Sequence, residues 1–438
     1  MRAAGEHSHS GRGMQLNYKR TFFVGLAFLS ISAFWSMYDG LIPLILKNTF
    51  AVGDTAAGVV MALDNILALF MLPLFGALSD RVRTPIGKRM PFILGGTAAA
   101  VISMIMIPIA DNAVNFPLFV AALFLTLVAM STYRSPAVAL MPDVTPKPLR
   151  SKANGVINLM GAVGGMISLV AMSLLIPDVG KPDYLPIFAI VAGLMVVAVV
   201  VLFVTIKENE LVAEMERQHG HGDEPGDAEQ SGGQLPPDVR RSLLFILASV
   251  FLWFMAYNAV TTAWSKYAQT VLGMAGGSFA SKLLLATAAA TLTFIPAGII
   301  ASYIGRKRTI MVGVSLLMAC FAAAFGFRSY NPLLDVLLIV IGVAWALINV
   351  NSYPMVVEMA KGSDVGKFTG YYYTFSMSGQ IITPILSGAF LEHVGYWTLF
   401  PYAALFALLA LITMSMVKHG DSKPQKLSSK VEYFGVDD

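Results

Sequence analysis

Twelve apolar runs constrain this chain more than any other feature of its sequence. Each run holds about 20 residues or more, the length that a helix needs to cross the hydrocarbon core of a bilayer. Lipid offers the backbone no hydrogen-bond partners, so only helices or a closed barrel can span it, and continuous apolar runs exclude the barrel. The sequence therefore predicts an all-α membrane protein with twelve transmembrane helices. The runs cover roughly residues 21–46, 56–78, 91–110, 117–141, 153–176, 184–206, 242–265, 281–304, 309–327, 333–357, 365–390 and 396–417.

The composition agrees with a chain that lies mostly in lipid. Hydrophobic residues make up 56% of it and charged residues 13%, whereas a soluble domain carries about 25% charged residues. The single cysteine, Cys320, excludes an internal disulfide and a cysteine-based metal site. We expect no cofactor, no metal and no nucleic-acid partner, and we expect a monomer. The first run is longer than a signal-peptide core, so we expect it to remain as the first helix.

Lysine and arginine are distributed unevenly between the two ends of the predicted helices. Most of the 30 fall in the tails and in every second loop. The other loops hold only Lys47, Lys181, Lys266, Lys282 and Arg328. Because cytoplasmic loops of membrane proteins carry the excess of positive charge, we expect a multi-pass protein of the cell membrane with both termini cytoplasmic.

Two sets of six runs flank a polar segment, residues 207–241, which has no apolar periodicity. The two sets resemble each other, because Asp143 and Gly155 return 215 positions later as Glu358 and Gly370. We therefore expect two pseudo-symmetric six-helix halves, with a solute bound between them near the membrane midplane. The predicted division is a cytoplasmic tail at 1–20, an N-terminal half at 21–206, a cytoplasmic linker at 207–241, a C-terminal half at 242–417 and a second cytoplasmic tail at 418–438.

A basic loop joins the second and third runs. Its sequence, Gly-Ala-Leu-Ser-Asp-Arg-Val-Arg-Thr-Pro-Ile-Gly-Lys-Arg-Met-Pro-Phe, covers residues 76–92, which we call the hinge. A second motif, Arg-Ser-Pro-Ala-Val-Ala-Leu-Met-Pro-Asp, begins at Arg134 and continues through Arg150 to Gly155. The hinge resembles the corresponding loop of the major facilitator superfamily, and both motifs together resemble the sucrose/proton symporters and the bordering glycoside–pentoside–hexuronide:cation symporters. The resemblance implies uptake of an α-glucoside or a similar sugar with a cation, usually H⁺.

The hinge carries candidate residues for a cytoplasmic gate. Asp80 can accept hydrogen bonds from a neighbouring helix N-terminus and from Arg81 or Arg89. Gly76 and Gly87 permit backbones to approach closely. We expect these contacts to hold the cytoplasmic side shut and to break on opening. Alternatively, the charges only set the topology.

Two further clasps are expected at equivalent places in the two halves. Asp143 can pair with Arg150, and Glu358 can pair with Lys361 or Lys367. Ordinary solvated loop charges are an equally good interpretation of these residues.

Charged residues inside the runs are candidates for ion coupling, because each costs about 2.5–3.5 kcal/mol at a helix centre and needs a cavity or a partner. We expect Asp64 to load a proton from outside and to release it inside. Asp39 lies at a similar depth and can share this role. Arg134 can pair with Asp64 or, as a structural alternative, with Asp143. The alternatives for the acids are a structural hydrogen bond at Asp64 and a place near the outer surface for Asp39.

Aromatic and amide side chains recur at helical spacing in both halves and are candidates for substrate binding. Such groups suit a neutral polyol better than an anion, which calls for more intramembrane cations. Polar residues also hold membrane helices together, so only the whole set carries weight. The candidates are Trp35, Asp39, Asn65, Tyr257, Asn258, Trp345, Asn349, Tyr373 and Gln380.

Together these features predict a secondary active transporter that imports a neutral sugar, either a disaccharide or another glycoside, coupled to protons by alternating access. The sequence has no phosphate-binding loop, dinucleotide fingerprint or Ser/His/Asp arrangement, so we expect neither ATP-driven transport nor an enzyme. The alternatives are an uncoupled facilitator or exporter of another small solute, a non-transporting membrane sensor with the same fold, and an integral membrane enzyme.

Overall fold

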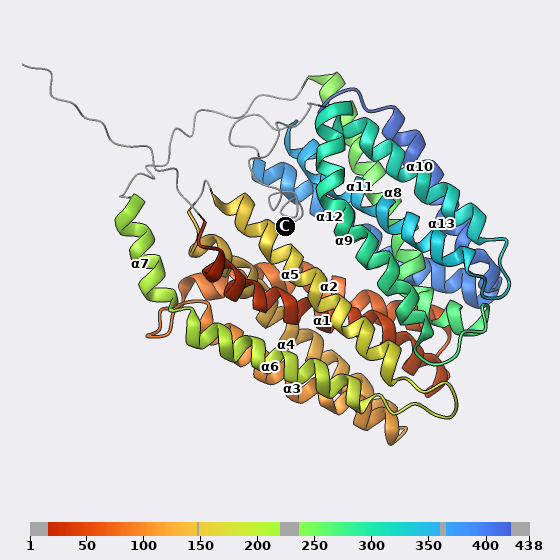
Figure 1. Cartoon of the computed structure of the whole chain (residues 1–438), viewed down its shortest axis with the longest axis horizontal. Helices are drawn as coiled ribbons and strands as arrows, with labels where there is room; N and C mark the ends of the chain where they lie inside the picture. The colour runs from red at the N-terminus through yellow and green to blue at the C-terminus, as the bar shows by residue number, and fades with distance from the viewer. Residues whose placement is uncertain (1–15, 147–148, 220–235, 360–364, 422–438) are drawn as a thin grey trace, which may run out of the picture.

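The computed structural model describes residues 16–146, 149–219, 236–359 and 365–421, and the regular elements within them are all helical (Figure 1). Parts of the expected tails and linker, residues 1–15, 220–235 and 422–438, lie outside the described residues. The first six helices are α1 (Tyr18–Asn48), α2 (Asp54–Arg81), α3 (Met90–Asn112), α4 (Phe116–Asp143), α5 (Arg150–Leu175) and α6 (Leu185–Thr205). They are followed by α7 (Glu208–His219), α8 (Pro237–Thr270), α9 (Ser278–Ile304), α10 (Arg306–Ala324), α11 (Leu333–Val357), α12 (Val365–His393), the 3₁₀ turn η3 (Tyr396–Thr398) and α13 (Leu399–Ser415).

Each predicted apolar run falls on one of the helices α1–α6 and α8–α13. Among the described residues, eleven helices are long and apolar enough to cross a membrane. The twelfth, α12, has 29 residues but carries many polar side chains, which lower its apolar content. The prediction of an all-α, multi-pass membrane protein is confirmed.

The polar segment 207–241 contains a helix that its sequence does not indicate. Helix α7 occupies the start of this segment and lies beside the bundle rather than within it (Figure 1). Leu211 of α7 packs on the core, and Glu214 lies 3.9 Å from Arg20 of α1. Because most α7 residues are polar, the helix presents no apolar run for a sequence analysis to find.

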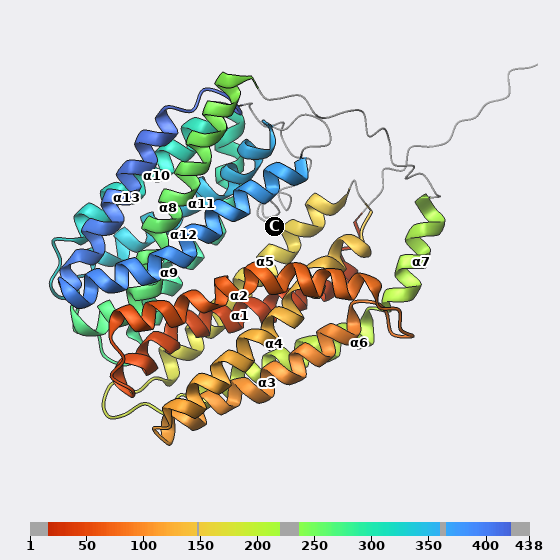
Figure 2. The ribbon, with the colours of Figure 1, turned by 180° about the vertical axis from the view of Figure 1, so that it is seen from behind.

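The membrane helices form two groups, α1–α6 and α8–α13, that meet along three helix pairs. Helix α2 packs against α12, α5 against α9, and α1 against α8. Figure 2 shows the two groups converging at one end and diverging toward the end where α7 lies. We call the diverging end, which carries the hinge, the hinge end, and we call the opposite end the far end.

Glycines bring the two halves into backbone contact near the far end. A side chain on Gly58 of α2 would overlap the carbonyl group of Pro384 on α12, and one on Gly388 would overlap that of Asp54. Gly277, which precedes α9, meets the backbone of α5 in the same way. Small residues allow such close approach between membrane helices. The halves are therefore tightly packed at the far end.

Candidate functional site

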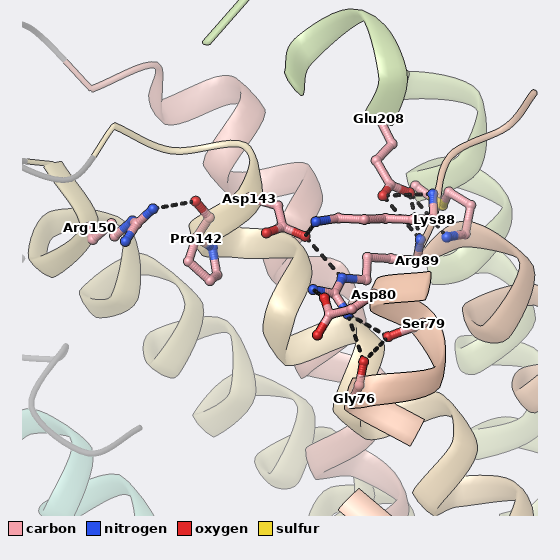
Figure 3. Close-up of polar contacts among 10 residues, drawn as sticks. Gly76, Ser79, Asp80, Lys88, Arg89, Pro142, Asp143, Arg150 and Glu208 are labelled. Carbon is pink, nitrogen blue, oxygen red and sulfur yellow. Dashed lines mark hydrogen bonds and ion pairs between the residues drawn. The ribbon is translucent and has the colours of Figure 1, made fainter. Parts of the chain in front are cut away.

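Arg89 is the centre of the hinge (Figure 3). It immediately precedes α3 and is only 5% exposed. Its guanidinium group forms ion pairs with Asp80 of α2 and, through Nε at 2.9 Å, with Asp143 of α4. It also donates hydrogen bonds to the Ser79 hydroxyl and to the Gly76 carbonyl oxygen. One buried cation thus joins the ends of α2, α3 and α4.

Glu208, the first residue of α7, caps the N-terminus of α3. Its carboxylate accepts hydrogen bonds at 3.0–3.1 Å from the backbone N–H groups of Lys88, Arg89 and Met90. These N–H groups have no partners within a helix, and a carboxylate also balances the positive end of the helix dipole. Gly87 permits the approach, because its φ of +119° suits glycine and a side chain there would collide with Glu208.

The C-terminal half repeats this arrangement with other residues. Arg306, at the start of α10, forms an ion pair with Glu358 at the end of α11. Asp421, which follows α13, accepts a hydrogen bond from the backbone N–H of Lys307 at 2.8 Å. Gly305 precedes α10 with a φ of +92°. Each half therefore has a basic residue, an acidic partner and an acid that caps the third helix of its six.

The predicted pairing of Asp143 with Arg150 is wrong. Asp143 binds Lys88 Nζ at 3.1 Å as well as Arg89, because the buried guanidinium group of Arg89 needs a carboxylate. Arg150 turns back from α5 and donates to the carbonyl oxygen of Pro142 at 2.9 Å, where the last carbonyl groups of α4 lack helical partners.

The structure also pairs Glu358 with a residue that the sequence analysis does not name. Arg306 forms an ion pair with Glu358, and the Lys367 ammonium group lies over an aromatic ring, 6.0 Å from its centroid. The other predicted partner, Lys361, lies outside the described residues. Sequence proximity favoured both lysines, whereas the fold brings α10 beside α11.

The ion pairs of the hinge stay within one half throughout the described part of the chain. Asp80 binds Arg89, and its other predicted partner, Arg81, is solvent-exposed. In this conformation the hinge therefore braces α2, α3 and α4 against one another. It does not clasp the two halves together, which agrees with their divergence at the hinge end.

The structure brings together the predicted charged residues of the N-terminal half. Asp39 on α1 and Asp64 on α2 are half-buried and lie close enough to act on each other electrostatically. Asn65 donates a hydrogen bond from Nδ2 to Asp64 Oδ1 at 2.9 Å. Arg134 acts electrostatically on Asp64, and its guanidinium carbon lies 6.0 Å from the ring centroid of Trp35. Two acids, one cation and an aromatic ring thus share one neighbourhood.

Arg134 forms no ion pair or hydrogen bond with any other residue that the structure describes. Asp143, its structural alternative, is already bound by Lys88 and Arg89. A cation at this depth needs water or a partner. Arg134 lines a cavity of about 620 Å³ between α2, α4 and α12. The mainly apolar walls include Ala68, Leu69, Leu72, Pro73, Val138 and Met377.

An aromatic pair of the C-terminal half lies on the other side of the interface from these charged residues. The rings of Tyr257 on α8 and Trp345 on α11 are stacked, with centroids 3.8 Å apart and an interplanar angle of 7°. Phe254 meets Trp345 edge-on. Tyr257 is close enough to Asp39 of the opposite half to interact with it electrostatically. The neighbouring Asn258 donates its amide N–H to the Phe254 carbonyl oxygen at 2.9 Å, which leaves its amide oxygen available.

The three remaining predicted binding residues divide into two groups. Tyr373 of α12 lines the cavity beside Arg134. Asn349 of α11 and Gln380 of α12 are half-buried and lie outside the lining of that cavity. The structure therefore brings Tyr373 together with Arg134 of the other half and leaves Asn349 and Gln380 apart from this cavity.

Sequence reasoning missed several charged residues to which the structure gives definite partners, among them Glu208, Asp421, Asp54 and Lys266. Glu208 and Asp421 each follow the sixth membrane helix of a half, and this position is their only sequence signal. Asp54 of α2 and Lys266 of α8 pair across the two halves at 2.5 Å. Both lie at ends of apolar runs, on the side where cations are scarce.

Comparison with known proteins gives three matches. The sequence profile of the Major Facilitator Superfamily matches residues 24–352 and 283–433. Multidrug resistance protein MdtG of Escherichia fergusonii is 21% identical over 407 residues, which cover 91% of this chain and 94% of that protein. A crystal structure of the nucleoside transporter NupG superposes with a TM-score of 0.67 at 16% identity, over 91% of this chain and 100% of that chain. At this identity the superposition shows a shared fold.

Proposed function

The chain belongs to the major facilitator superfamily, and we propose that it imports a neutral polyhydroxylated solute, such as a disaccharide or another glycoside, together with protons. The family makes it a secondary transporter of a small molecule across a bilayer rather than an enzyme. The observation that carries the proposal is the placement of Asp39 and Asp64 beside Arg134 and Tyr257, where the two halves face each other.

Proton coupling follows from the charge balance of this neighbourhood. Asp39 and Asp64 together carry two negative charges when both are ionised, and Arg134 balances only one. Like charges at close range disfavour joint ionisation, and a low-dielectric surrounding strengthens this effect. A proton bound to one of the two carboxyl groups therefore neutralises the remaining negative charge. The site can take up this proton when it is open to one side of the membrane and release it when it is open to the other.

The substrate class rests on the groups that face this site. The ring pair of Tyr257 and Trp345 offers a flat apolar face of the kind that packs on a sugar ring. The amide oxygen of Asn258 and the carboxyl groups of Asp39 and Asp64 accept hydrogen bonds from hydroxyl groups. The resemblance of residues 76–92 and 134–155 to the sucrose and glycoside symporters supports the same class.

We place the hinge end and both termini in the cytoplasm, because most loop cations gather there. In that orientation the chain is closed toward the outside and open toward the cytoplasm. The division into tails, two six-helix halves and a linker that holds α7 is part of the proposal, as is a monomeric state. Transport then consists of rocking between this inward-open state and an outward-open one.

A second candidate function is export of an apolar, drug-like solute. The mainly apolar walls of the 620 Å³ cavity favour it, and one relative bears the name of a multidrug resistance protein. A nucleoside combines a flat ring with hydroxyl groups, so it belongs among the substrates to be compared.

Uptake into proteoliposomes tests the proposal. The purified protein is supplied with labelled disaccharides, nucleosides and a cationic dye, with and without an inward proton gradient. We expect a glycoside to accumulate only with the gradient. Accumulation of the dye alone, or equal uptake with and without the gradient, contradicts the proposed function.

Variants separate coupling from binding. Asp64→Asn is expected to abolish accumulation but to retain exchange of labelled for unlabelled solute, since exchange needs no net proton movement. Asp183→Asn, at an acid outside the membrane helices, is the matched control and is expected to accumulate solute normally. Full accumulation by Asp64→Asn assigns the proton to another group.

A further inference from the structure

A buried ion pair joins the two halves at the far end. Lys266 of α8 donates to Asp54 of α2 over 2.5 Å, and the two side chains are only 6% and 12% exposed. The remaining space beside them is about 10 Å³, which is at the lower limit for a single water molecule. The two charges therefore neutralise each other at an interface that excludes nearly all water.

Further polar contacts extend this ion pair on both sides of the interface. Tyr396 of η3 donates its hydroxyl hydrogen to Asp54 at 3.1 Å, and Lys47 of α1 donates to the Tyr396 oxygen at 2.9 Å. Separately, Glu392 of α12 accepts the backbone N–H of Thr55 at 2.7 Å and so caps the N-terminus of α2. Helices α1 and α2 are thus tied to α8, η3 and α12.

The far-end ion pair differs from the others that the structure describes, because each of those lies within one half or its adjoining linker helix. Lys282 and Asp335 pair at 2.9 Å near the same end, but both belong to the C-terminal half. The pairs around Arg89 and Arg306 lie at the hinge end and likewise stay within a half. Rocking of one half against the other breaks the contact between Asp54 and Lys266 and leaves these other pairs intact.

We propose that Asp54 and Lys266 form the latch of the far-end gate and set the balance between the two conformations of the transporter. In the closed state each charge is the partner of the other. Removal of one leaves the other buried without compensation, and separation of the halves relieves this by admitting water. The inference concerns the conformational balance alone, so it holds whichever solute is carried.

Distances between spin labels test the latch on purified protein without any solute. In a Cys320→Ala background, Val179→Cys and Val394→Cys report on the far end, since both positions are exposed and lie in opposite halves. A second protein with Ile86→Cys and Tyr303→Cys reports on the hinge end in the same way. The unmodified latch is expected to give a short far-end distance and a long hinge-end distance.

The variant Asp54→Asn is expected to raise the ratio of open to closed far ends about tenfold. The hinge-end distance should shorten in the same sample, because the halves rock as bodies. The exchanged pair, Asp54→Lys with Lys266→Asp, should restore the original distances, which a merely damaged fold would not do.

Lys282→Met is the matched control, because it breaks an ion pair of similar geometry at the same end within one half. It is expected to leave both distances unchanged. Unchanged far-end distances in Asp54→Asn, or an equal change in Lys282→Met, overturn the proposal. So does a far end that opens without closure of the hinge end.

Discussion

The carboxylate of Glu208 lies 3.0 Å from the backbone nitrogen of Arg89, although 119 residues separate the two in the chain. This contact attaches the helix that follows the sixth membrane span to the loop between the second and third. Contacts of the hinge therefore join three separate stretches of the chain, since Asp143 of α4 also binds Arg89.

Loss of the Glu208 charge is expected to weaken the hinge. Glu208→Gln keeps the size of the side chain but reduces its interaction with three N–H groups and the helix dipole, at a cost of about 0.5–2 kcal/mol. Thermal unfolding in detergent should show a lower midpoint. Glu210→Gln, on a side chain that is 72% exposed, should leave the midpoint unchanged, and equal effects of the two variants count against the capping role.

Two glycines with positive φ provide a matched test of the close approach at the hinge. Gly87 has a φ of +119° and Gly180 a φ of +90°, but a side chain meets Glu208 only at Gly87 and meets open space at Gly180. Alanine at Gly180 is expected to cost about 1 kcal/mol of backbone strain. Alanine at Gly87 adds a collision and should lower the unfolding midpoint more. A smaller loss at Gly87 contradicts the observed packing.

The corresponding cap of the C-terminal half is expected to contribute less. Asp421 accepts one backbone N–H group, from Lys307, whereas Glu208 accepts three. Asp421→Asn should therefore lower the unfolding midpoint by less than Glu208→Gln in the same assay. The reverse order indicates that the two caps are not equivalent parts of a repeated design.

The stacked rings are expected to determine the apparent affinity for the transported solute. Trp345→Leu removes the partner of Tyr257 while it keeps an apolar side chain on α11, and loss of a sugar-packing face is expected to raise KM about tenfold. Trp397→Leu changes a tryptophan that is 48% exposed at the far end and serves as the control. Initial rates of uptake at increasing solute concentration give the KM of each variant. An unchanged KM in Trp345→Leu would show that the ring pair does not contact the transported solute.

The membrane helices could be predicted because hydrocarbon thickness fixes their length and backbone pairing fixes their type. Helix α7 could not be predicted in this way, because its sequence is mostly polar. Neither hydrocarbon thickness nor an apolar run fixes the length of a helix beside the bundle. The row of polar residues on α12 was recognisable as a candidate lining, and Tyr373 does line a cavity beside Arg134. Asn349 and Gln380 show that helical spacing alone does not decide which of these residues reach it.

The partners of charged residues were predicted less well than their positions. Asp143 and Arg150 are close in sequence, yet Asp143 binds Arg89, because the buried cation gains more from a carboxylate than the partly exposed Arg150 does. Long-range pairs such as Asp54 with Lys266 depend on how two halves of the chain meet. A single sequence records no such relationship.

The cap at Asp421 bears on how the protein is handled in the laboratory. Helix α13 ends at Ser415, and a truncation there removes only residues that look like a dispensable polar tail. Such a truncation also deletes the group that accepts the Lys307 N–H and leaves the start of α10 uncapped. An affinity tag therefore belongs well beyond Asp421, because a chain that ends at Ser415 also loses the buried Val417 and the hydrogen bond between His419 and Ser242.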